Sequence, residues 1–64
     1  EKEENKFLLL RGERVYEESL GMKRVQAEQV LRKFEHALDS YDAEQIADTK
    51  RELIEFLEKL DEWD

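Results

Sequence analysis

His36 is the only imidazole in the chain and the first residue to consider for catalysis or metal binding. It lies between Glu35 and Ala37, on the side of its predicted helix away from Phe34, and the chain contains no cysteine. A single histidine without cysteine or a second histidine makes a poor metal site. Helical bundles can hold two metals with Glu-x-x-His pairs, but the residue three positions before His36 is Lys33. We therefore predict an ordinary, solvent-exposed histidine.

The carboxylates at the end of the chain do not form a recognisable site either. Asp61, Glu62 and Asp64 lack the spaced oxygen ligands and the glycine of a calcium loop. The sequence also has no glycine-rich phosphate loop and no serine paired with a histidine, and a thin helical bundle rarely forms a catalytic pocket. We expect no catalytic residue, no cofactor-binding residue and no metal ligand in this chain, and hence no enzyme.

Length and charge narrow the range of partners. Sixty-four residues allow one small domain, and a net charge of −7 disfavours nucleic acid, which requires clustered Lys and Arg. No run approaches the ~18 apolar residues of a membrane span, and no signal peptide is visible, so we expect a cytoplasmic protein without a membrane partner. The chain opens on Glu1-Lys2-Glu3-Glu4 without an initiating Met, which suggests residues 1–64 are a single domain cut from a longer protein.

The stretch from Ala37 to Ile46 predicts the end of one helix and the start of the next. Asp42 is a preferred N-cap, and Gln45, three residues on, can accept a hydrogen bond from the Asp42 N–H, as in a capping box. Tyr41 and Ile46 occupy the positions of a hydrophobic staple. Three signals therefore place one helix boundary here.

The rest of the chain favours helix throughout, because it has no proline and only two glycines. We predict an all-α, antiparallel three-helix bundle with helices over residues 3–20, 23–39 and 43–62. Gly21 suits the left-handed conformation after a helix end, so the first turn is placed at residues 20–23. The alternative is one long helix that runs through Gly21.

Hydrophobic residues at intervals of three and four define the predicted core, with Phe34 at its centre. Lys50 interrupts the third stripe, and its aliphatic stem can lie along the core while its ammonium reaches water. The stripes are Leu8, Gly12, Val15 and Ser19, widened by Phe7, Leu9, Leu10, Tyr16 and Leu20; Ala27, Val30, Leu31, Phe34, Ala37, Leu38 and Tyr41; and Ile46, Lys50, Leu53, Leu57 and Leu60, with Ile54, Phe56 and Trp63 beside them.

Two features of the first helix remain open. Phe7, Leu8, Leu9 and Leu10 are consecutive, so they point to every side of a helix, and at least one must face solvent or contact something outside this chain. These four residues are the candidate partner surface. Gly12 costs about 1 kcal/mol relative to Ala inside a helix, which suggests either a close approach of a neighbouring backbone or a tolerated surface glycine.

Beyond these patterns, the central corner resembles the C-terminal helical lid of the seventy-kilodalton heat-shock chaperones, the DnaK-type family. Family lids show an "ALxxxD" turn, an Ile four residues after its Asp, and an "EL" pair seven residues further, which correspond here to Ala37-Leu38, Asp42, Ile46 and Glu52-Leu53. The run Leu8 to Glu18 is similar to the distal half of the long lid helix. The family's longer, often Pro-containing connection is replaced here by Leu20-Gly21-Met22-Lys23, and the chain ends in Glu62-Trp63-Asp64 rather than the family's acidic co-chaperone motif.

The resemblance implies the distal lid of an ATP-dependent chaperone, which closes over a bound apolar peptide and slows its release. ATP would be bound by the parent protein, outside this chain. The implied partners are the rest of the parent chaperone and, indirectly, unfolded polypeptide clients. The alternative is an independent helical interaction or oligomerisation module that uses its surplus hydrophobic face.

Overall fold

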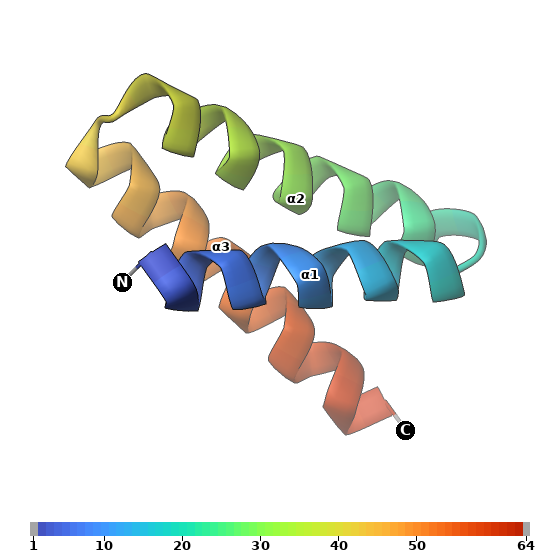
Figure 1. Cartoon of the computed structure of the whole chain (residues 1–64). Helices are drawn as coiled ribbons and strands as arrows, with labels where there is room; N and C mark the ends of the chain where they lie inside the picture. The colour runs from blue at the N-terminus through green and yellow to red at the C-terminus, as the bar shows by residue number, and fades with distance from the viewer. Residues whose placement is uncertain (1, 64) are drawn as a thin grey trace.

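Three helices make up the fold, which the computed structural model describes for the backbone of residues 2–63 and the side chains of residues 3–60. Helix α1 spans Lys2–Glu18, α2 spans Gly21–Ser40 and α3 spans Ala43–Trp63. α1 and α2 lie side by side and run in opposite directions, and α3 turns back and crosses them obliquely (Figure 1). No strand occurs between residues 2 and 63. The predicted antiparallel three-helix bundle is confirmed, and the alternative of one helix through Gly21 is wrong.

The core lies where the predicted stripes of the three helices meet. Phe34 of α2 is fully buried, with 0% of its surface exposed, so its predicted central place is confirmed. Burial of a side chain of this size contributes about 1.5–3 kcal/mol to the free energy of unfolding. The other buried hydrophobic side chains are Leu8 from α1, Ala27, Leu31 and Ala37 from α2, and Leu53 and Leu57 from α3.

Gly12 of α1 lies against Leu31 of α2. The residue is buried, and a Cβ atom built on it would lie 2.8 Å from Cδ1 of Leu31, closer than carbon atoms in proteins pack. Leu31 is itself fully buried and has little room to move. The alternative of a tolerated surface glycine is wrong, because Gly12 is buried; the atoms that crowd it are side-chain atoms of Leu31 and Leu53, and not the neighbouring backbone that was predicted.

The first corner consists of Ser19 and Leu20, between α1 and α2. The predicted position, residues 20–23, is too late in the chain, because α2 already begins at Gly21. Gly21 has the expected left-handed backbone, with a φ of 61°. Leu20 is the N-cap of α2 in extended conformation, with φ −131° and ψ 157°, and no side chain caps this helix end. The cap is missing because leucine has no side-chain atom that can accept a hydrogen bond.

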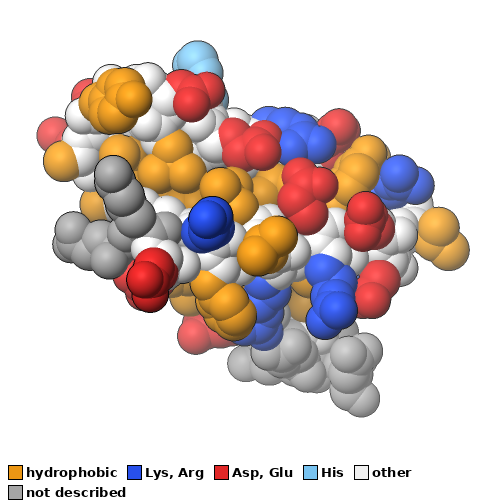
Figure 2. Space-filling model, in the orientation of Figure 1, with side chains coloured by type: hydrophobic (Ala, Val, Ile, Leu, Met, Phe, Trp, Pro, Cys, Tyr) orange, Lys and Arg blue, Asp and Glu red, His pale blue; other side chains and the backbone are white. Residues whose placement is uncertain are grey.

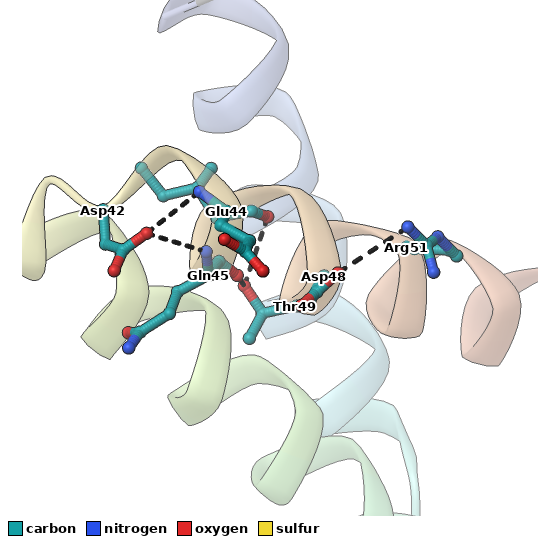
Figure 3. Close-up of polar contacts among 7 residues, drawn as sticks. Asp42, Glu44, Gln45, Asp48, Thr49 and Arg51 are labelled. Atoms are coloured by element: carbon teal, nitrogen blue, oxygen red, sulfur yellow. Dashed lines mark hydrogen bonds and ion pairs between the residues drawn. The ribbon is translucent and has the colours of Figure 1, made fainter.

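The second corner consists of Tyr41 and Asp42, between α2 and α3, and its predicted cap is present. The Oδ1 atom of Asp42 accepts hydrogen bonds from the backbone N–H groups of Glu44 at 3.0 Å and Gln45 at 3.2 Å (Figure 3). These bonds satisfy two donors that have no partner inside the first turn of α3. Thr49 adds a bond from its hydroxyl to the Gln45 carbonyl at 2.8 Å.

Two other predictions for this corner are wrong. Tyr41 does not staple Ile46, because its side chain is 90% exposed. Since α2 continues to Ser40, Tyr41 is the C-cap of that helix, with a left-handed φ of 60° that turns its ring outward. Gln45 does not accept from the Asp42 N–H, which donates instead to Oγ of Ser40 at 3.2 Å.

Lys50 shows how α3 accommodates a charge in its core stripe. Its ammonium lies 2.5 Å from a carboxylate oxygen of Glu4 on α1, while most of the side chain is covered. The hydrogen bond from Lys50, and then its positive charge, lowers the pKa of the Glu4 carboxyl. The predicted snorkelling of Lys50 is thus confirmed. The side chains of Asp61, Glu62 and Trp63, and all of Asp64, lie outside the described residues.

Candidate interaction surface

The titratable residues do not gather into a recognisable chemical site in the part of the chain that the structure describes. His36 is exposed, as the sequence predicts. Between residues 3 and 60, no group of three or more histidine, aspartate and glutamate side chains is arranged to hold a metal ion. Within the described helices, none combines the length and apolar character needed to cross a bilayer. The features that remain to be explained are hydrophobic side chains on the surface.

The four consecutive hydrophobic residues of α1 divide between core and solvent. Leu8 is buried against Phe34, and Leu9 is partly buried beside the same core. Phe7 and Leu10 point outward, with 62% and 67% of their surfaces exposed. The candidate partner surface is therefore narrower than the run from Phe7 to Leu10, because the 100° turn per residue sends its two middle members inward. Hydrophobic side chains are visible on the outer face of α1 between acidic and basic groups (Figure 2).

Phe7 and Leu10 belong to a longer row of residues, which we call the outer stripe of α1: Glu3, Phe7, Leu10, Arg14 and Glu17. Their intervals of four and three residues place them on one face of a helix. All five are exposed, whereas the stripe of Leu8, Gly12, Val15 and Ser19 on the other side faces the core. The polar members of the outer stripe, Glu3, Arg14 and Glu17, were missed by sequence reasoning that followed hydrophobic residues only.

The charged members of the outer stripe are available to another molecule. Among the described residues, neither Glu3 nor Arg14 forms an ion pair. Eleven residues separate the two in the sequence, or about 16 Å along a helix, so they cannot pair with each other within one α1. An ion pair between them is therefore possible only between two molecules.

α3 crosses α1 obliquely (Figure 1). A shallow groove lined by residues of both helices lies beside the outer stripe. Its hydrophobic lining comes from Phe7, Leu10 and Val15 of α1 and from Leu57 and Leu60 of α3, and Arg14 is one of its charged lining residues. The groove is open rather than enclosed, so it offers a surface for a helix or side chain and not a cavity for a small substrate.

The opposite edge of α1 is occupied by contacts with α2. Arg32 lies 3.1 Å from Glu13 of α1 and 2.7 Å from Glu35, and it also stacks near the ring of Tyr16. The hydrogen bonds that Arg32 donates to the carboxylates of Glu35 and Glu13 raise the pKa of its guanidinium. Arg24 lies closer to the Tyr16 ring, at 4.5 Å from its centre. These exposed contacts orient α1 on α2 and add little to stability, since solvent screens them.

A second group of exposed hydrophobic residues lies around the first corner: Leu20, Met22 and Val25. Leu20 was expected to widen the core stripe of α1, and this prediction is wrong. Because α1 ends at Glu18, Leu20 belongs to the connection and points into solvent, with 80% of its surface exposed.

No family model, no curated protein and no solved structure matches this chain. The resemblance to the DnaK-type lid therefore depends on the residues at the second corner, and the outer face of α1 is the other feature that bears on function.

Proposed function

We propose that this bundle is the distal part of the helical lid of a DnaK-type, ATP-dependent chaperone, where it helps to gate the release of unfolded peptide clients. The observation that carries the proposal is the second corner. The residues behind the resemblance form one structural unit there: Phe34 and Ala37 are buried at the end of α2, Asp42 caps α3, and Leu53 returns to the core. A corner built this way joins two helices in a fixed relation, which a lid that moves as a rigid body requires.

The proposed role is mechanical and not catalytic. The parent protein supplies the nucleotide-binding domain that hydrolyses ATP and the β-sandwich that holds an apolar peptide, and both lie outside these residues. The chain itself binds no cofactor, acts in the cytoplasm, and has the rest of the chaperone as its direct partner. A closed lid slows the escape of a bound peptide, so the effect falls on the dissociation rate more than on the association rate.

The gene upstream of Glu1 provides the first test. We expect it to encode a nucleotide-binding domain followed by a β-sandwich. If neither domain precedes this chain, the proposal is wrong.

The second test measures peptide release from the full-length parent protein with a fluorescent, unfolded peptide. Phe34→Ala, which removes the centre of the core, should unfold the bundle and raise the dissociation rate. Phe7→Ala is the matched control, since it deletes the same side chain from an exposed position and leaves the bundle folded. Equal dissociation rates for the Phe34→Ala variant and the unaltered protein would count against gating by this bundle.

The exposure of Phe7 and Leu10 favours a second candidate function, that of an independent helical interaction or oligomerisation module. Exposed hydrophobic residues rimmed by charges are typical of protein–protein contact sites. If this candidate is right, Phe7→Asp abolishes association and leaves the helical content unchanged, because the ring makes no buried contact to lose. Sedimentation of the isolated chain tests this candidate: a strict monomer at high concentration argues against the module.

A further inference from the structure

The outer stripe of α1 carries its charges in an order that makes it complementary to itself. From the N-terminal end, an acid, two hydrophobic residues, a base and a second acid follow one another: Glu3, Phe7, Leu10, Arg14 and Glu17. When two copies of a helix pair in antiparallel fashion, residues whose numbers have a constant sum lie opposite each other. The residue numbers of Phe7 and Leu10 have the same sum as those of Glu3 and Arg14. One antiparallel alignment therefore places Phe7 opposite Leu10 and Glu3 opposite Arg14.

We propose that the outer stripe is a self-association surface, on which a second copy of this chain docks with its own α1 in antiparallel orientation. Phe7 of each copy then lies against Leu10 of the other, and these two contacts cover the hydrophobic residues that α1 exposes. Glu3 of each copy lies against Arg14 of the other, so that two ion pairs flank the hydrophobic centre. The proposal does not depend on the lid function, because it concerns a face of α1 that the second corner does not touch.

The charges of the outer stripe favour a second copy of the chain as the partner and an antiparallel orientation of the two α1 helices. In a parallel pair, each Glu3 would face a Glu3 and each Arg14 an Arg14, and like charges directly opposite each other repel. The antiparallel register converts all four charges into attractive pairs. It also leaves both copies of Glu17 beyond the paired segment, where they face solvent.

The size of the contact predicts a weak dimer. The paired segment from residue 3 to residue 14 is about 16 Å long. One helix pair of this length buries less than the ~1,200 Å² of a stable interface. In addition, each copy carries a net charge of −7, which opposes association. We therefore expect a dissociation constant between about 10 μM and about 1 mM.

Charge reversal of the two stripe residues tests the register in the 64-residue chain by sedimentation equilibrium. Glu3→Arg alone places two pairs of arginines opposite each other and should weaken dimerisation by roughly tenfold. The double variant Glu3→Arg, Arg14→Glu restores both pairs in reversed polarity and should return the dissociation constant to within about threefold of the original value. Because Glu3 and Arg14 cannot meet within one molecule, this rescue reports a contact between copies.

A matched control separates the register from net charge. Glu3→Arg changes the net charge by +2, from −7 to −5, which on general grounds should strengthen association. Glu55→Arg makes the same change beside the α2–α3 surface, away from the outer stripe, and should strengthen association or leave it unchanged. Phe7→Asp should leave no detectable dimer. A chain that stays monomeric at millimolar concentration, or variants Glu3→Arg and Glu55→Arg that behave alike, would overturn the proposal.

Discussion

The two corners of the bundle each join two helices, and each has only one of the two residue types that such connections favour. A left-handed residue at the connection and a capping acceptor at the start of the next helix are both common at such corners. At the first corner the left-handed residue is a glycine, Gly21, which begins α2 and does not end α1, and the N-cap Leu20 has no acceptor. The second corner has the favoured N-cap, Asp42, but places Tyr41 in the left-handed conformation.

Neither corner therefore combines both favoured residue types. A residue with a Cβ in the left-handed region costs about 1–2 kcal/mol, and an absent cap costs about 1 kcal/mol, so each corner carries a local penalty of similar size. Both are tolerated because the helices that they join are held together elsewhere, by the core around Phe34.

The largest effect is expected at the core that both corners share. Phe34→Ala should lower the free energy of unfolding by about 3–5 kcal/mol through loss of burial and a residual cavity. A domain of this size has little more than that in total, so the variant should be largely unfolded at room temperature. Thermal denaturation followed by circular dichroism measures the loss. Phe7→Ala deletes the same side chain at an exposed site and should cost less than 1 kcal/mol.

If thermal unfolding of the Phe34→Ala variant matched that of the original chain, the core assignment would be wrong. The interpretation that the core holds the helices together, and that the corners make only small local contributions to stability, would then be wrong as well.

At the first corner, Gly21→Ala tests the left-handed backbone. A Cβ at this position would meet nothing within 4 Å, so any cost comes from the φ of 61° and not from a clash. We expect a loss of about 1–2 kcal/mol, measured by urea denaturation. Gly21→Asn is the control, since asparagine tolerates this conformation better, and its loss should be smaller. Equal losses for alanine and asparagine would show that the backbone conformation is not the cause.

At the second corner, Asp42→Ala should lower the free energy of unfolding by about 1 kcal/mol, because the N–H groups of Glu44 and Gln45 lose their acceptor. Asp42→Asn keeps a side-chain oxygen at the same position and should lose only a fraction of this amount. The measurement is again urea denaturation. A variant Asp42→Ala as stable as the original would mean that water replaces the cap without cost, and the contrast between the corners would disappear.

Most of the fold could be predicted from the sequence because burial repeats along each helix. Leu31 and Phe34 lie three residues apart on α2, Leu53 and Leu57 lie four residues apart on α3, and all four are buried. The sequence determines the helix ends less well, since moving a helix end by one residue changes few contacts. The first turn was placed too late for this reason: α2 begins at Gly21 itself, which leaves only two residues for the connection.

The candidate surface was predicted only in part. Hydrophobicity alone marks Phe7 and Leu8 equally, and only the helix rotation distinguishes the exposed ring from the buried Leu8. The same rotation, applied to charged residues, would have revealed Glu3 and Arg14 on the face of Phe7. Tyr41 was beyond prediction for another reason. Its backbone conformation follows from the packing of two helices joined by two residues, and not from any preference of tyrosine for that conformation.

The smallest expected effect is a gain in stability at Tyr41. Glycine adopts a φ of 60° without strain, but it also makes the unfolded chain more flexible, so Tyr41→Gly should raise the free energy of unfolding by only about 0.5 kcal/mol. Tyr41→Ala is the matched control: it removes the same ring, which is 90% exposed, and keeps a Cβ in the left-handed region, so its stability should stay close to that of tyrosine. The difference between the two variants in urea denaturation isolates the backbone contribution. If Tyr41→Ala stabilised the chain as much as Tyr41→Gly does, the exposed ring and not the backbone conformation would be the source of the free-energy cost at Tyr41. The second corner would then carry no backbone penalty to set against the missing cap of the first corner.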